Sequence, residues 1–167
     1  MSNHAPDSAD RGLTHVGNSG EARMVDVGAK AETERVARAK GRIRMSAATL
    51  EAIAANSLKK GDVLAVARVA GILAAKRTAE LIPLCHPIPL TDLQIQLSLD
   101  AALPGIRVEA TARTTWKTGV EMEALTAVSV SLLTIYDMAK SLDREMELGD
   151  ISLVQKSGGK LDYEVKP

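Results

Sequence analysis

Two stretches of alternating apolar and polar residues, 93–99 and 106–113, flank the pair Pro104-Gly105. Alternation at every second position is the pattern of a β-strand that buries one face. The Pro-Gly pair predicts a turn, so the two stretches predict an antiparallel hairpin. Because each strand keeps one polar face, we expect helices to cover only the opposite face of the sheet.

Two further strands are predicted outside this hairpin. Residues 34–45 alternate cations with small or apolar side chains, which indicates a strand with one basic face. Residues 151–154 form a last strand, which Ser157-Gly158-Gly159 ends. The two faces of the 34–45 strand carry Arg38, Lys40, Arg42 and Arg44 on one side, and Ala37, Ala39, Ile43 and Met45 on the other.

Helices are predicted between these strands. Ser46 is a good N-cap for residues 46–55, and Asp62 caps a helix that runs to about residue 81. Residues 82–89 contain three prolines and cannot form a regular helix. The longest predicted helix covers residues 120–141.

The predicted order of elements is strand, helices, strand, strand, helix and strand. This is the split β-α-β order of ferredoxin-like sheets. It predicts an α+β fold, a ferredoxin-like two-layer sandwich with an antiparallel sheet and helices on one face. The other sheet face is moderately polar and is a surface that a second subunit could cover.

Length and composition point to one domain. We divide the 167 residues into a flexible N-terminal tail, 1–22, and a single catalytic α+β domain, 23–167. Lys and Arg total 21, Asp and Glu also total 21, and aromatic residues are scarce, which argues against a nucleic-acid partner. The single Cys excludes an internal disulfide. Without a membrane-length apolar run or a signal peptide, we expect a cytoplasmic protein with no membrane partner.

The predicted helix over residues 120–141 carries charged residues at both ends. Glu121 follows Thr118 at the spacing of a capping box, so a structural role competes with ligand binding, whereas Glu123 is not needed for a cap and is otherwise a solvated acid. Asp137 and Lys140 share a face at i and i+3. They are either an ordinary surface ion pair or a lysine held by a carboxylate for proton transfer.

Three loop segments supply further candidates. The glycines of Lys156-Ser-Gly-Gly-Lys160 predict an anion-binding nest flanked by cations, or a plain loop after a strand. Lys60 lies just before a predicted helix start, where it is either a second candidate for anion binding or part of a plain helix cap. Between prolines, Cys85 and His86 are adjacent, and His86 is a candidate proton carrier or an ordinary loop histidine. One Cys and three His do not predict a metal site. Together these side chains suit a small polyphosphate ligand with acid–base chemistry on an attached heterocycle.

Several motifs in this order resemble the cyclic pyranopterin monophosphate synthase family of molybdenum cofactor biosynthesis, the MoaC family. The resemblance covers residues 14–163, nearly all of the chain outside the tail. Trp116 and Arg42-Ile43-Arg44 look individual to this chain and put no site residue in doubt. The motifs are Met24-Val-Asp-Val, Lys60-Gly-Asp-Val, Ala70-Gly-Ile with Ala75-Lys-Arg-Thr, Leu81-Ile-Pro-Leu-Cys-His-Pro, Lys117-Thr-Gly-Val-Glu-Met-Glu-Ala-Leu-Thr, Leu133-Thr-Ile-Tyr-Asp-Met and Lys156-Ser-Gly-Gly-Lys.

The resemblance implies a lyase that converts 3′,8-cyclo-7,8-dihydroguanosine triphosphate into cyclic pyranopterin monophosphate and releases pyrophosphate. It also implies a ferredoxin-like fold and a homohexamer, a trimer of dimers, with active sites at subunit contacts. By motif, the implied catalytic residues are Asp137, Lys140 and Lys60. The implied substrate-binding residues are Asp26, Arg35, Cys85, His86, Glu121, Met122, Glu123 and Lys156.

This family reaction assigns roles to these residues. Lys140 and Lys60 are the expected general acid and base, because neighbouring cations disfavour a charged lysine. Arg35, His86 and Lys156 would bind the departing pyrophosphate. The sequence assigns no cofactor with certainty; Mg²⁺ could accompany the triphosphate, although no carboxylate cage for it is evident.

Two other interpretations stay open from the sequence. The first is a non-catalytic nucleotide-binding ferredoxin-like module, which needs the basic face and the Gly-Gly loop but not Asp137. The second is a structural oligomer whose small-residue helices serve packing. In the catalytic interpretation, the two ends of the helix over 120–141 lie too far apart for one compact ligand, so they are expected to serve different copies of the site.

Overall fold

The computed structural model describes residues 21–159 and 161–165, so the predicted tail, 1–22, lies almost wholly outside the described residues. The described chain contains five strands and four helices. In order they are β1 (Thr33–Arg44), α1 (Ala47–Ala54), α2 (Val63–Ala75), α3 (Thr78–Leu81), β2 (Asp92–Asp100), β3 (Gly105–Trp116), α4 (Glu121–Ala139), β4 (Glu147–Ser157) and β5 (Tyr163–Glu164).

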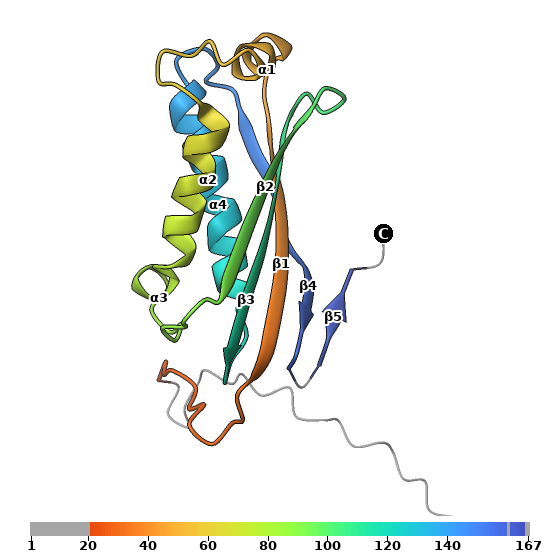
Figure 1. The fold of residues 1–167 in the computed structure, drawn as a ribbon. Coiled ribbons are helices and arrows are strands. Elements are labelled where there is room, and N and C mark those ends of the chain that lie inside the picture. Colours follow the sequence, from red (N-terminus) through yellow and green to blue (C-terminus); the bar gives the residue numbers. More distant parts are fainter. Residues whose placement is uncertain (1–20, 160, 166–167) are drawn as a thin grey trace, which may run out of the picture.

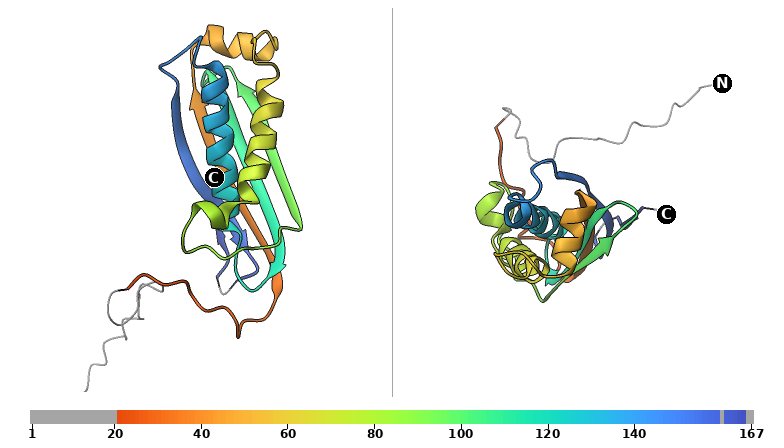
Figure 2. Two further views of the ribbon diagram at one scale, coloured as in Figure 1. Left: turned by 90° about the vertical axis from the view of Figure 1, so that its left-hand side faces the viewer. Right: turned by 90° about the horizontal axis from the view of Figure 1, so that it is seen from above.

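The strands form one antiparallel sheet in the order β2-β3-β1-β4-β5. The two long helices, α2 and α4, lie side by side on one face of this sheet, and the other face is left open (Figures 1 and 2). This arrangement confirms the predicted α+β ferredoxin-like sandwich. The predicted hairpin is β2 and β3, paired along the whole length of β2 from Asp92 opposite Arg113 to Asp100 opposite Gly105.

Small side chains fill the centre of the sheet. Ala37 and Ala39 of β1 pair with Ala112 and Ala110 of β3, and all four are buried under the helices. At Gly41 the sheet comes so close to α4 that an added Cβ would lie 2.8 Å from Val128. The scarcity of aromatic residues therefore matches a core in which backbones approach one another closely.

α2 and α4 are in contact at Gly71. A Cβ at this position would lie 2.3 Å from Ser131 Oγ and 2.8 Å from the Ala127 carbonyl oxygen. Ser131 is itself buried and donates a hydrogen bond of 3.0 Å to the Ala67 carbonyl. A larger side chain at Gly71 would have to push the two helices apart.

We therefore expect Gly71→Val to lower the free energy of unfolding by roughly 1–3 kcal/mol or more, the cost of overpacking a tight core. Urea unfolding at a fixed protein concentration would measure the change. Gly149→Ala is the matched control, because the nearest atom to its added Cβ is Arg42 Nε at 4.0 Å. Equal stability of the two variants would contradict this account of the helix contact.

The helix caps agree with the sequence predictions, whereas some element boundaries do not. Ser46 and Asp62 cap α1 and α2 as predicted, with hydrogen bonds to the amides of Thr49 and Ala65. The helix predicted to run from 62 to 81 is wrong in length: it stops at Ala75 and the short α3 follows. β4 begins earlier and ends later than the predicted strand 151–154, and β5 was not predicted.

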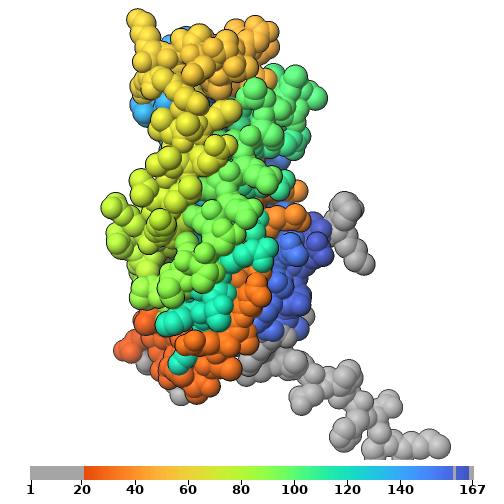
Figure 3. Space-filling model, in the orientation of Figure 1, coloured from red at the N-terminus to blue at the C-terminus, as the bar shows by residue number. Residues whose placement is uncertain are grey.

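The outer faces of the helices expose large apolar side chains. Val66, Val69 and Leu73 lie along the exposed side of α2, which forms part of the molecular surface in Figure 3. Leu133 of α4 is also more than half exposed. α4 is long and apolar enough to cross a membrane, but it packs on the sheet and on α2, so its apolar residues build the core.

Candidate functional site

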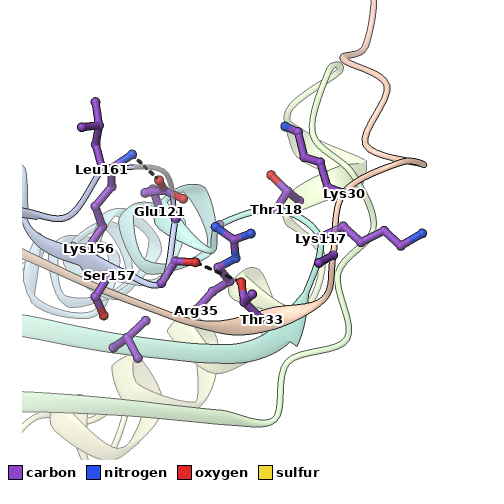
Figure 4. A pocket seen from close by; sticks show the side chains of 14 residues that line it. Lys30, Thr33, Arg35, Lys117, Thr118, Glu121, Lys156, Ser157 and Leu161 are labelled. Atoms are coloured by element: carbon purple, nitrogen blue, oxygen red, sulfur yellow. Dashed lines mark hydrogen bonds and ion pairs between the residues drawn. The ribbon is translucent and has the colours of Figure 1, made fainter.

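A hollow of about 440 Å³ lies at the end of the sheet where α4 begins. We call it the cationic hollow, because Lys30, Arg35, Lys117 and Lys156 line it together with one carboxylate, Glu121. Figure 4 shows Arg35 and the Lys156–Glu121 pair facing the hollow from different elements. Lys117 extends the other way and donates a hydrogen bond of 2.8 Å to the Gly28 carbonyl.

The strand register explains why Arg35 and Lys156 meet. Ala37 of β1 pairs with Lys156 of β4, and Arg35 lies two residues before Ala37, so both long side chains leave the sheet on the helix-covered side. Arg35 Nε donates a hydrogen bond of 3.4 Å to the Trp116 carbonyl. A Cβ on Gly159 would lie 3.0 Å from Arg35 Nη1, so the absence of a side chain there leaves room for the guanidinium.

Glu121 binds Lys156 and does not form the predicted capping box. Its Oε1 lies 3.1 Å from Lys156 Nζ, and the helix begins after Val120 with no side-chain cap among the described residues. The carboxylate folds back over Gly119, where an added Cβ would overlap Glu121 Oε2. The Lys-Thr-Gly-Val-Glu motif therefore places this acid in the hollow.

The loop after β4 differs from the predicted anion nest. Gly158 has φ +86°, a conformation that favours glycine. Its N–H is already donated to Asp162 Oδ1 at 3.1 Å, and its carbonyl accepts from Thr33 Oγ1 at 2.9 Å. The amide is thus used within the loop, and the expected nest of free N–H groups is wrong at this position. Lys160, the second cation of the motif, lies outside the described residues.

A second hollow of about 650 Å³ adjoins the first. We call it the apolar cavity, because aliphatic side chains dominate its wall. The two hollows share Lys30, Thr118, Gly119 and Glu121 in their walls, so they lie side by side. The other lining residues of the apolar cavity are Val25, Val27, Ile82, Leu84, Cys85, His86, Ile88, Met122 and Glu123.

His86 connects the cavity to the segment before β1. Its Nε2 lies 2.8 Å from the Val25 carbonyl oxygen, so Nε2 carries the proton in this hydrogen bond. Asp26, the next residue, is exposed and is not among the described lining residues of either hollow. Its Oδ1 accepts from the Gly28 amide at 2.7 Å, and this bond shapes the turn that leads to Lys30.

Glu123 is buried, so its interpretation as a solvated acid is wrong. Only 3% of the residue is exposed, and its Oε2 has no hydrogen-bond partner among the described residues. Burial raises the pKa of Glu123 to about 7, and the negative charge of Glu121 adds to this, while the Glu123 backbone amide opposes it. The pKa of the Cys85 thiol is also raised, by burial and by Glu123.

The predicted catalytic residues gather at the far end of α4. Lys140 Nζ lies 2.7 Å from Asp137 Oδ1, and Lys60 Nζ lies 3.0 Å from Oδ2. This lysine cluster borders a hollow of about 430 Å³, which Tyr136 and Arg144 also line. The structure thus brings together Lys60 and the Asp137–Lys140 pair, which lie 77 residues apart in the chain.

Opposite charges in the lysine cluster stabilise one another within the chain. Hydrogen bonds from Lys140 and then Lys60 lower the pKa of Asp137 to about 2. The hydrogen bond and charge of Asp137 raise the pKa of Lys140. The expectation that neighbouring cations disfavour a charged lysine is therefore wrong for Lys140 in the isolated chain, since the carboxylate outweighs them.

The lysine cluster and the cationic hollow do not meet within this chain. Sixteen helical positions separate Glu121 from Asp137, a distance of about 24 Å at about 1.5 Å per residue. The structure groups Arg35, Glu121 and Lys156 at one end of α4, with the Cys85–Glu123 cavity beside them. Lys60, Asp137 and Lys140 lie at the other end.

Three cations of these hollows were not singled out in the sequence: Lys30, Lys117 and Arg144. Lys117 is the first residue of the motif that contains Glu121, so its place in the sequence could have indicated a position beside that acid. Lys30 lies in a segment without periodicity, and Arg144 follows the end of α4. Only the folded chain shows that these two face a hollow.

Comparison with known proteins identifies the family to which this chain belongs. A family model described as MoaC family matches residues 24–159. A cyclic pyranopterin monophosphate synthase of Roseiflexus sp. (strain RS-1) is 61% identical over 89% of this chain and 94% of its own length. A protein of the same name from Parvibaculum lavamentivorans is 57% identical over 95% of this chain and 99% of its own length. The chain belongs to the MoaC family.

Proposed function

We propose that this chain is a cyclic pyranopterin monophosphate synthase, a lyase that acts in molybdenum cofactor biosynthesis. Its substrate is 3′,8-cyclo-7,8-dihydroguanosine 5′-triphosphate, and its products are cyclic pyranopterin monophosphate and pyrophosphate. The observation that carries the proposal is the adjacency of the cationic hollow and the apolar cavity, which share four lining residues. Family membership agrees with this ligand, and a cytoplasmic location suits a biosynthetic enzyme.

The triphosphate binds in the cationic hollow. Arg35 presents a planar donor fork suited to phosphate oxygens, and Lys156 adds a compact charge beside it. Lys156 is held by Glu121 in the free protein, so a phosphate group would compete with this carboxylate for the ammonium. Release of Glu121 would leave its oxygens free to accept hydrogen bonds from the attached heterocycle.

The heterocycle binds in the apolar cavity. Met122 and the aliphatic wall pack against the ring, while the few polar groups at its edge fix its orientation. Cys85 and His86 face the ring from the proline-bounded loop and Glu123 from α4. This division, phosphates on one side and ring on the other, uses all the predicted binding residues except Asp26, whose role is to shape the turn before Lys30.

The lysine cluster of a second subunit completes the site. Each protomer holds the two halves about 24 Å apart, so a subunit related by a twofold axis would bring one half to the other in two copies. The exposed Val66, Val69, Leu73 and Leu133 give the helix layer apolar area for such contacts. A homohexamer built as a trimer of dimers is the assembly we propose.

The chemistry divides between the two halves. Lys140 and Lys60 exchange protons with ring nitrogens while the five-membered ring opens and the pyrazine ring closes. A sugar hydroxyl then attacks the innermost phosphorus, the bond to the bridging oxygen breaks, and pyrophosphate leaves with the electron pair. Arg35 and Lys156 stabilise the charge that develops on the leaving group, whereas His86, which lines only the apolar cavity, stays with the ring.

Magnesium enters this scheme only with the substrate. Within residues 21–159 and 161–165, no group of three or more His, Cys, Asp or Glu side chains is placed to hold a metal ion. We propose that a Mg²⁺ ion bound to the triphosphate keeps phosphate oxygens and water as its ligands. The residues of the cationic hollow then contact the phosphates and not the metal.

The direct test supplies the purified protein with the cyclic dihydroguanosine triphosphate. We expect equal amounts of cyclic pyranopterin monophosphate and pyrophosphate, measured by chromatography of the pterin and by an enzymatic pyrophosphate assay. The reaction should be followed with and without added Mg²⁺. Absence of both products under every condition, with tight binding of the triphosphate, would identify a non-catalytic nucleotide-binding module instead.

A further inference from the structure

Glu123 lies between the apolar cavity and a third hollow of about 320 Å³ behind it. We call this the rear hollow; residues 75–80 and 87–89 form its wall. Among the described residues, only Ile88 and Glu123 line both spaces, and only Glu123 can carry a proton. Glu123 is thus the one titratable residue of these two walls that can face a bound ring on one side and water on the other.

The environment of Glu123 does not hold it in one charge state. An unpaired buried carboxylate is costly, and Oε2 finds no partner among the described residues. The charged or titratable groups on the cavity side are Lys30, Cys85, His86 and Glu121. On the side of the rear hollow they are Lys76, Arg77 and Glu80. No salt bridge joins Glu123 to any of these described groups, whereas Glu121 is paired with Lys156.

We propose that Glu123 is a catalytic residue that takes a proton from the bound heterocycle and passes it to solvent through the rear hollow. This inference rests on the proposed function. In the first step a ring N–H bond breaks, its electron pair stays on the nitrogen, and an O–H bond forms at Oε2. In the second step this proton moves to a water molecule in the rear hollow, which restores the carboxylate.

The proposal explains why a binding residue is buried and unpaired. A group whose pKa lies near the working pH is the most effective proton acceptor, because it is ionised often enough and still binds the proton well. With a pKa near 7, Glu123 is mostly a carboxylate above that pH and mostly a carboxylic acid below it. Since the first step needs the carboxylate, kcat should rise as the pH increases through this value.

The first experiment compares the wild-type enzyme with Glu123→Gln, which keeps the shape and hydrogen-bonding capacity but cannot relay a proton. We expect kcat to fall about 100-fold or more, KM to change little, and the rise of kcat near neutral pH to disappear. Glu123→Asp, which keeps the acid on a shorter stem, should recover part of kcat and the pH dependence. A Glu123→Gln enzyme that keeps wild-type kcat, or that loses only substrate affinity, would overturn the proposal.

The second experiment tests the route. Ala79→Leu places a larger side chain in the wall of the rear hollow without touching the apolar cavity, and Ala52→Leu is the control at a half-buried helical alanine that lines neither space. We expect Ala79→Leu alone to lower kcat several-fold at unchanged KM, and a small diffusible buffer such as imidazole to restore it. Equal kcat values in the two variants would exclude the rear hollow as the route.

A readout independent of turnover separates this inference from the proposed function. Infrared difference spectra of the full-length protein should show a protonated-carboxyl band that titrates near neutral pH and is missing in Glu123→Gln. If the band is present but no product forms from the substrate, the proposed function fails and the proton position stands. If product forms and the band is absent, the inference about Glu123 fails alone.

Discussion

Lys140→Ala is expected to reduce kcat by about 100- to 10,000-fold, the range for loss of a general acid–base group. Lys140 holds its ammonium 2.7 Å from Asp137 in the lysine cluster, and its side chain is about half exposed, at 52%. Because it supports no buried contact, the variant should fold and assemble normally. Single-turnover measurement of pterin formation, with a melting curve for the same sample, would test both statements.

The control for Lys140 is Lys59→Ala. Lys59 is exposed next to Lys60 but does not line the hollow of the lysine cluster, so its loss changes the local charge without removing a member of the cluster. We expect this variant to keep wild-type kcat. Wild-type turnover in Lys140→Ala would remove Lys140 from the proton chemistry, and an equal loss in both variants would indicate only a general electrostatic effect.

Mixing two inactive variants is expected to restore activity. In an Arg35→Ala subunit the lysine cluster is intact, and in a Lys140→Ala subunit the cationic hollow is intact. If each site takes one half from each of two subunits, random assembly of equal amounts gives an intact site in about one case in four. Co-assembled samples should therefore reach about a quarter of the wild-type rate, from parents that are nearly inactive.

A second mixture controls for indirect effects. Lys60→Ala and Lys140→Ala both damage the lysine cluster, so no exchange of subunits between them can create an intact site. This pair should remain inactive under the same conditions. Recovery in neither mixture would mean that both halves of a working site come from one chain, which contradicts the proposed subunit contact.

The sheet was predictable because its strands alternate with a period of two. Ala37 and Ala39 were assigned to the buried face, and Ser46 and Asp62 cap the helices as expected. The break at Ala75 was not predictable, since the apolar pattern of α2 continues into α3 without a proline or glycine. The edge strand β5 consists of two residues, too few to show any alternation.

The site was predictable only as a set of residues. The motif named Glu121, but its capping-box spacing suggested a backbone contact, and the folded chain shows an ion pair with Lys156 instead. Burial of Glu123 could not be inferred, because it depends on how the loop around Cys85 and the start of α4 come together at one cavity. The pairing of Lys60 with Asp137 likewise required the tertiary structure.

The length of α4 has a consequence for how this protein can vary. One helix separates Glu121 from Asp137, and in the proposed assembly the two ends contribute to different sites. Insertion of a single residue between them would rotate one end by about 100° relative to the other and shift it by about 1.5 Å. Both active sites of a pair would be misaligned at once, and repairing one end would disturb the other. Insertions and deletions should therefore be eliminated from the helix itself.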